Sequence, residues 1–260
     1  MKNLVIGSTS QLAHYFPKES CEFISSRNID ISSIKEKRWD RIFICFAEQR
    51  TFIEDSYEMF TKANVDDTIT LINSIKGCAN TVVTYLTAEL WNQTTTGSIS
   101  VEDTFNYDKT PYIESKKLLF SKLLEGGFEN VISLFPVNFN SVHRKKGYLF
   151  SKIFDSIINK KKITIGNTYF YRDLVHPKFV VEQSLTANKN MLVGSGRLTF
   201  VNDFIRDLYK HSNLDYNEYV TEDASCSLRT KRNMYYVHSN EVLYPYKTLL
   251  TDTLKDLKND

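Results

Sequence analysis

The sequence predicts an α/β fold: a doubly wound parallel sheet covered by helices, with a small C-terminal α/β lobe. Three observations lead to this prediction. Continuous apolar runs recur through the first half of the chain without polar alternation, which is typical of parallel strands buried on both faces. Stretches with apolar residues at helical spacing separate these runs. The first run ends at a glycine followed by small polar residues, which indicates a tight turn at the carboxyl end of a strand.

Five apolar runs are the candidate strands of the sheet. They comprise residues 4–6, 21–24, 41–46, 81–86 and 130–135. The spacing of apolar residues predicts crossover helices over residues 64–76 and from Pro111 to Leu124. Past residue 140, amphipathic segments predict helices at 149–158 and near 201–211.

Composition and charge limit the possible partners. The 260 residues are 42% hydrophobic, which is enough apolar material for a packed core. Lys and Arg total 33 against 31 Asp and Glu, so the formal net charge of +2 provides no strong field for nucleic acid or an anionic membrane. No apolar run approaches the ~20 residues that cross a bilayer, and the first run is too short for a signal peptide. A cytoplasmic protein without a nucleic-acid or membrane partner is therefore expected.

The turn after the first strand is a candidate phosphate-binding site. Gly7, Ser10 and Ala13 have the spacing of a GxxGxxG motif in which two glycines are replaced, and a helix is expected to open there. Ser10 would adopt a positive φ less readily than glycine. An ordinary strand-to-helix turn is the alternative interpretation. The residues expected to contact a dinucleotide here are Gly7, Ser8, Thr9, Ser10, Gln11 and Leu12.

The end of the second strand bears on the choice of cofactor. An acidic residue at this position typically binds the ribose 2′-hydroxyl of NAD, whereas Arg27 suits the 2′-phosphate of NADP. A solvated surface arginine is the alternative. Asp30 stands where a carboxylate could bind the adenine amino group. The sequence therefore favours NADP(H).

Tyr112 and Lys116 form a candidate proton-transfer pair. They stand four residues apart just after Pro111, which favours a helix start, so both side chains lie on one helical face. A neighbouring ammonium favours the phenolate and brings a tyrosine toward a useful acid/base range. A helix-surface pair is the alternative. Thr87 and Glu89 follow the fourth strand, where ligands of such sheets bind.

Several short motifs, in this order, resemble the extended short-chain dehydrogenase/reductase superfamily, and within it the GDP-mannose 4,6-dehydratase and GDP-4-keto-6-deoxyhexose reductase branch. They are Phe46-Ala47-Glu48-Gln49 (family LAAQ), Thr87-Ala88-Glu89-Leu90-Trp91 (TSELY), Gly166-Asn167 with Arg172-Asp173 and His176 (GN…RDWGH), and residues 213–220 (GLDWxxYV). The resemblance covers nearly the whole chain. It implies a Rossmann fold in which residues 1–140 bind NADP and carry the YxxxK motif. Residues 141–260 would mainly bind a sugar nucleotide, with a possible return of the chain to the sheet.

The resemblance also implies roles for individual residues. Thr87 would hydrogen-bond the sugar, Tyr112 would exchange a proton, Lys116 would bind the nicotinamide ribose, and Glu89 would act as base in a dehydratase. Further cofactor contacts are expected from Phe46, Ala47, Phe135 and Pro136. Substrate contacts are expected from Asn138, Lys152, Arg172 and Arg229, with a GDP-linked sugar as substrate, no metal ion, and a homodimer as the assembly.

The chain departs from the family pattern in two places. Besides the replaced glycines, Phe179 stands where the family's RDWGHAKD motif has its last aspartate. A dehydratase keeps its cofactor through oxidation and re-reduction, whereas a reductase exchanges it every turnover, so the altered turn favours the reductase. The alternatives are a GDP-sugar 4,6-dehydratase or epimerase that uses the same triad plus Glu89, and a catalytically silent dinucleotide-binding protein.

Overall fold

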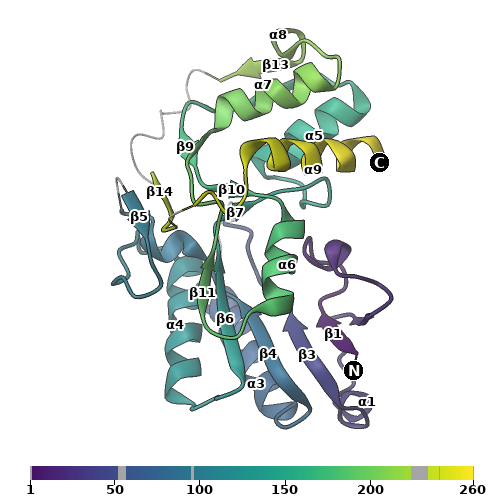
Figure 1. The fold of residues 1–260 in the computed structure, drawn as a ribbon, viewed down its shortest axis with the longest axis vertical. Coiled ribbons are helices and arrows are strands. Elements are labelled where there is room, and N and C mark those ends of the chain that lie inside the picture. The colour runs from purple at the N-terminus through teal and green to yellow at the C-terminus, as the bar shows by residue number, and fades with distance from the viewer. Residues whose placement is uncertain (1, 52–56, 95–96, 224–233, 240, 260) are drawn as a thin grey trace. The chain divides into compact units, whose positions relative to one another are not determined.

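The computed structural model describes residues 2–51, 57–94, 97–223, 234–239 and 241–259 (Figure 1). The chain forms two compact units. The first contains Met1–Leu90, Tyr107–Pro136 and Val181–Leu192, and the second contains Trp91–Asn106, Val137–Val180 and Val193–Asp260. Both units are discontinuous in sequence. The functional division at residue 140 stays a prediction.

A six-stranded sheet forms the centre of the first unit, in the order β11-β6-β4-β3-β1-β2. Figure 1 labels its strands from β11 to β1. Its strands are β1 (Asn3–Ile6), β2 (Cys21–Ile24), β3 (Trp39–Ile44), β4 (Ala79–Tyr85), β6 (Val131–Pro136) and β11 (Met191–Val193). The pairs β1–β2, β1–β3, β3–β4 and β4–β6 are all parallel. The predicted α/β class and its five strands are confirmed, and β11 is an additional strand of three residues.

The order of the strands locates the edge where a ligand should bind. From β1 the chain first adds β2 on one side, and it then crosses to add β3 on the other side of β1. In open α/β sheets, ligands bind at the carboxyl ends of the strands where the winding reverses. Here those ends are the residues that follow β1 and β3.

The described helices of the first unit alternate with its strands along the chain. They are α1 (Ile31–Lys35), α2 (Tyr57–Thr61), a π-helical turn (Lys62–Asp66), α3 (Asp67–Ser74) and α4 (Pro111–Glu125). In α4, the Thr110 hydroxyl accepts a hydrogen bond from the Ile113 N–H at 3.3 Å, and Pro111 occupies the first turn, where its missing N–H costs nothing.

The prediction of an α-helix directly after β1 is wrong. Only a 3₁₀ turn, Ala13–Tyr15, forms there. The Ser10 hydroxyl accepts a hydrogen bond from the Ala13 N–H, an alternative to helical bonding that serine side chains commonly provide. Pro17 then forces its predecessor, Phe16, into an extended conformation with ψ 141°. The segment is too short between these two signals for an α-helix.

The second unit combines helices with two-stranded ladders. Its helices are α5 (Leu149–Asn159), α7 (Val201–His211), α8 (Tyr216–Tyr219) and α9 (Tyr246–Asn259), and α6 (Pro177–Thr186) begins in this unit. The ladders pair β10 (Leu174–Val175) with β7 (Asn138–Phe139), β12 (Thr199–Phe200) with β9 (Tyr171–Arg172), β13 (Val220–Glu222) with β8 (Ile163–Ile165), and β14 (Tyr235–Val237) with β5 (Gly97–Ile99). Both predicted helices past residue 140 are present. Across the described ranges, no helix is both long enough and apolar enough to span a membrane.

Candidate active site

Gly7 brings the ends of β1 and β3 into close contact. Its φ is +105°, and a Cβ added to it would lie 3.0 Å from the Phe46 nitrogen and 3.1 Å from the Cys45 carbonyl carbon. A side chain at this position is therefore excluded both by the backbone conformation and by the neighbouring strand. The turn keeps a backbone surface at the sheet edge where the winding reverses, which is what close approach of a phosphate requires.

The rest of the turn is held by its own hydrogen bonds. The Ser10 N–H donates to the Gly7 carbonyl, and the Ala13 N–H donates to the Ser10 carbonyl and hydroxyl. The residues of positive φ do not include Ser10, so the conformational cost expected for replacing this glycine does not arise. Because no α-helix follows, a bound diphosphate would meet the N–H groups of a turn without a helix dipole behind them. The remaining predicted contacts of the turn are Ser8, Thr9, Gln11 and the buried Leu12.

Arg27 and Asp30 lie beyond β2 and are both exposed. The Arg27 N–H donates to the Ser25 hydroxyl at 3.2 Å. The Asp30 carboxylate caps α1, because it accepts hydrogen bonds from the N–H groups of Ser32 and Ser33 and from the Ser33 hydroxyl. These hydrogen bonds lower the pKa of Asp30. Asp30 thus has a local structural role, and its contact with adenine stays a prediction.

The carboxyl end of β4 meets the buried lysine of α4. The Lys116 ammonium donates to the backbone carbonyl of Tyr85, the last residue of β4, at 3.0 Å. Thr87 follows two residues later and is buried, and its hydroxyl oxygen accepts a hydrogen bond from the Glu89 N–H at 3.2 Å. Tyr112 lies one helical turn before Lys116 and is partly exposed, as is Glu89. The structure therefore brings Lys116 to the strand end that carries Thr87 and Glu89.

Burial changes the acid/base properties of Lys116. Its side chain is only 3% exposed, and desolvation lowers the pKa of its ammonium to about 8. The group is still mostly charged at pH 7. A surface pair, which was the alternative interpretation of YxxxK, does not describe a lysine buried to this degree.

Asn64 is a site-adjacent residue that the sequence did not reveal. It lies in the π-helical turn, and its side chain accepts from the Glu48 N–H at 2.8 Å and donates to the Glu48 carbonyl at 3.1 Å. It also donates to the Ser115 hydroxyl at 3.0 Å, which in turn donates to the Tyr112 carbonyl at 2.7 Å. One buried amide thus fixes the loop after β3 and the first turn of α4. The signal available in the sequence was the position of Asn64, a polar residue on an otherwise apolar face of the predicted helix.

The remaining predicted cofactor residues lie at two strand ends of the same sheet. Phe46 and Ala47 follow β3 and are partly exposed. Phe135 and Pro136 end β6, and the Phe135 ring packs edge-on against Phe120 of α4 at 5.1 Å between centroids. Phe135 is fully buried, so its side chain is part of the core behind this edge.

Three of the four predicted substrate residues lie in the described part of the second unit. Asn138 is in β7, and Lys152 is an exposed residue of α5. Arg172 is in β9 and is 6% exposed; its guanidinium donates to the Tyr171 carbonyl at 2.7 Å and lies over the Phe170 ring at 4.6 Å. Arg229 lies outside the described residues. The described residues contain no cluster of His, Cys, Asp and Glu that could hold a metal ion.

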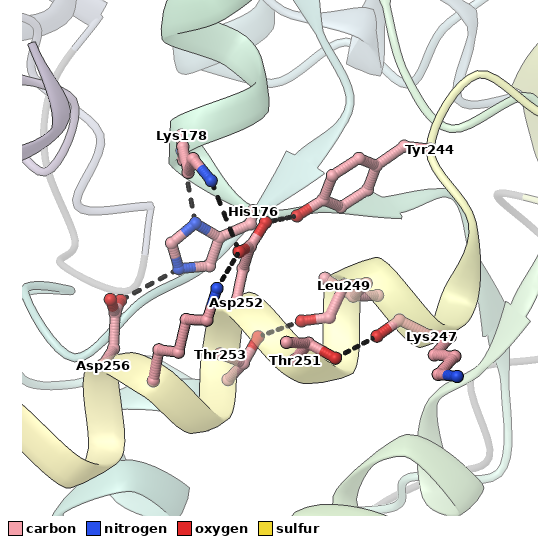
Figure 2. Close-up of polar contacts among 10 residues, drawn as sticks. His176, Lys178, Tyr244, Lys247, Leu249, Thr251, Asp252, Thr253 and Asp256 are labelled. Carbon is pink, nitrogen blue, oxygen red and sulfur yellow. Dashed lines mark hydrogen bonds and ion pairs between the residues drawn. The ribbon is translucent and has the colours of Figure 1, made fainter.

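The segment after Arg172 fastens the C-terminal helix (Figure 2). The buried His176 ring contacts the Asp256 carboxylate of α9 at 2.9 Å through Nε2. Its Nδ1 accepts a hydrogen bond from the Lys178 N–H at 3.3 Å, which leaves the ring proton on Nε2 as the donor to Asp256. Asp252, one turn earlier in α9, accepts from the Tyr244 hydroxyl at 2.7 Å and pairs with the Lys178 ammonium at 3.5 Å.

No protein-family model and no curated protein sequence matches this chain. Solved structures share its fold over its whole length. RMD from Pseudomonas aeruginosa complexed with NADPH has a TM-score of 0.77 at 14% identity, covering 100% of this chain and 99% of that one. A dTDP-glucose 4,6-dehydratase from Bacillus anthracis in complex with NAD has a TM-score of 0.77 at 15% identity, covering 100% and 97%. An ADP-L-glycero-D-manno-heptose-6-epimerase from Helicobacter pylori has a TM-score of 0.76 at 15% identity, covering 100% and 96%. The chain has the Rossmann-type fold of these enzymes.

Proposed function

We propose that this chain is an NADPH-dependent short-chain dehydrogenase/reductase that reduces the 4-keto group of a GDP-4-keto-6-deoxy sugar, a hexose or heptose, in bacterial surface-polysaccharide synthesis. The observation that carries the proposal is the buried Lys116, which lies one helical turn from Tyr112 and contacts the end of the strand that leads to Thr87. Nothing in folding calls for a buried, charged lysine at this point, because burying an ammonium group is costly.

The residues at the sheet edge fit a dinucleotide. Gly7 leaves space that a Cβ would fill, at the carboxyl ends of the two strands where the winding reverses. The turn residues 7–12 would hold the diphosphate, Arg27 would bind a 2′-phosphate, and Lys116 would reach the nicotinamide ribose. Bound NADPH would supply the hydride.

The protein's own side chains would handle the proton. The Thr87 hydroxyl accepts from the Glu89 N–H, so its own proton can be donated to the carbonyl oxygen of the substrate. Tyr112 would give its phenolic proton to that oxygen as negative charge develops on it, and the nearby Lys116 charge would favour the resulting phenolate. In the second unit, Asn138, Lys152, Arg172 and Arg229 are proposed to bind the sugar nucleotide, with Arg172 on its diphosphate.

The turn at residues 7–12, the candidate phosphate-binding site, favours a reductase over a dehydratase. A 3₁₀ turn in place of an α-helix offers a diphosphate fewer aligned N–H donors and a smaller dipole. Such a turn suits a cofactor that leaves after each reaction. A dehydratase or epimerase, with Glu89 as the base, would need to retain its cofactor. A silent binding protein would not need Thr87, Tyr112 and Lys116 together.

The test is incubation of the purified chain with freshly prepared GDP-4-keto-6-deoxymannose while the absorbance of NADPH, and in parallel of NADH, is followed. We expect oxidation of NADPH in preference to NADH. Tyr112→Phe should lower kcat by at least about a hundredfold and leave NADPH binding unchanged, because only the proton donor is lost. Turnover retained by this variant would refute the role of Tyr112. If a parallel incubation with GDP-mannose and no added NADPH consumes the GDP-mannose, the result would instead support the dehydratase.

A further inference from the structure

The carboxylate of Asp173 gathers donors from two other segments of the second unit. Its Oδ1 accepts hydrogen bonds from the Ser195 N–H at 2.8 Å and from the Ser195 hydroxyl at 2.7 Å. Its Oδ2 accepts from the Val237 N–H at 3.0 Å. The side chain is only 2% exposed, and burial raises its pKa although the hydrogen bonds act in the opposite direction. A carboxylate is tolerated at such a position because several donors surround it.

Gly194 leaves the space that this carboxylate occupies. A Cβ on Gly194 would lie 2.6 Å from the Asp173 Oδ2 and 2.5 Å from a methyl group of Val237. A real Cβ essentially never comes this close to another atom, so only a glycine at position 194 leaves room for the carboxylate and for Val237. This one junction therefore contains both a glycine without room for a side chain and a buried acidic group.

The junction leads back to Arg172. The Ser195 hydroxyl, which donates to Asp173, also accepts from the Arg197 N–H at 3.3 Å. Two residues later, Thr199 of β12 pairs with Arg172 of β9 in an antiparallel register. Asp173 therefore closes a ring that runs from Arg172 through its own carboxylate, along residues 195–199, and back to Arg172 through the strand pair.

We propose that Asp173 is a positioning residue that sets the place of the Arg172 guanidinium for a diphosphate group; this inference rests on the proposed function. An arginine that binds a diphosphate through two parallel hydrogen bonds depends on its orientation, and displacement by about 1 Å can cost up to a hundredfold. The two Ser195 donors and the Val237 N–H are all satisfied only by a side chain whose polar atoms are all acceptors, as in a carboxylate. Asparagine, of the same size, would turn an N–H₂ toward one of them.

The decisive variant is Asp173→Asn, compared with Asp215→Asn as the matched control. Asp215 caps α8 from an exposed position, where asparagine caps equally well. We expect Asp173→Asn to raise the KM for the sugar nucleotide about tenfold while kcat stays within about twofold and NADPH binding is unchanged. Asp215→Asn should change none of these quantities. Ser195→Ala keeps the backbone bond to Asp173 and should raise KM by about two- to threefold, so the inference can be tested even where Asp173→Asn folds poorly.

A double-variant cycle with Arg172→Ala separates positioning from general structural damage. Binding of GDP, UDP and dTDP to the full chain is measured by calorimetry for the wild type, both single variants and the double variant. Where Asp173 acts through Arg172, the double variant binds no more weakly than Arg172→Ala alone. Additive losses in nucleotide binding would overturn the inference and leave the proposed function standing. A wild-type chain that binds none of the three nucleotides would overturn both.

Discussion

Lys116→Met tests whether the buried ammonium of the candidate active site is held at a cost to stability. Burial lowers the pKa of Lys116 from 10.5 to about 8. Since one pH unit corresponds to about 1.4 kcal/mol, keeping the charge in the folded protein at pH 7 costs roughly 3 kcal/mol. Methionine has a similar volume and no charge, but it gives up the hydrogen bond to the Tyr85 carbonyl, a loss of about 1–2 kcal/mol. We expect the variant to be about 1–2 kcal/mol more stable than the wild type at pH 7 and to be inactive.

The gain in stability should depend on pH in a defined direction. Between pH 8 and 10.5, the unfolded wild type keeps the proton on Lys116 that the folded wild type has released. Wild-type stability therefore rises with pH in this window, whereas the variant has no such group. The advantage of Lys116→Met should be complete below pH 8 and about 2 kcal/mol smaller at pH 9.5. Urea unfolding of both proteins at pH 7 and pH 9.5 measures the difference.

The neighbouring Lys117 provides the control. It lies on the same helix, is exposed, and contacts the Tyr107 ring from 5.5 Å. Lys117→Met should change stability by less than about 0.5 kcal/mol at both pH values. If Lys116→Met is less stable than the wild type at pH 7, or if its advantage is the same at both pH values, desolvation is not the main influence on Lys116 and the reasoning is refuted.

Two further predictions concern the turn and the C-terminal helix. Gly7→Ala should weaken NADPH binding more than tenfold and lower stability by about 2–3 kcal/mol, because a Cβ meets the Phe46 nitrogen at a φ of +105°. Gly77→Ala is the control, because Gly77 has a φ of +81° and nothing lies within 4 Å of the added Cβ, so this variant should lose only the smaller amount of stability due to backbone strain. Fluorescence titration measures NADPH binding and urea unfolding measures stability. Equal losses for Gly7→Ala and Gly77→Ala would contradict the argument that the strands approach closely at Gly7. His176→Ala should lower the free energy of unfolding by about 2–3 kcal/mol, because it leaves a cavity in place of a buried ring and removes the hydrogen bond from that ring to Asp256. Asp256→Asn keeps an acceptor for the ring N–H of His176 and should lower the free energy of unfolding by less than about 1 kcal/mol. A loss as large as that of His176→Ala would show that the negative charge of Asp256, and not only its hydrogen bond, holds the ring.

Local signals predicted the elements that carry the candidate catalytic pair. Pro111 marks the first turn of α4 within the sequence itself, and the apolar run predicted for β4 ends just before Thr87 and Glu89. The same kind of signal was misread after β1. The spacing of small residues indicated a helix, but Ser10 bonds the backbone locally and Pro17 ends the segment.

Contacts between distant residues were beyond local reasoning. The role of Asn64 depends on Ser115, which lies 51 residues away, and on the loop carbonyl of Glu48. The strand β11 has three residues, and only its neighbour in the sheet, β6, makes it recognisable as a strand. In each case the pattern along the chain is too short, and the partner that stabilises it is supplied by the fold.

Phe179, which replaces the last aspartate of the RDWGHAKD motif that this segment resembles, packs between α6 and the segment before α9. In place of an aspartate, its ring stacks on Tyr244 with centroids 4.7 Å apart. The Tyr244 hydroxyl reaches the carboxylate of Asp252, and that carboxylate pairs with Lys178, the residue before Phe179. The negative charge near the start of α6 is thus supplied from α9, and the aromatic stack adds apolar contact to it. Phe179 therefore has a packing role of its own in this chain, next to the ion pair between Lys178 and Asp252.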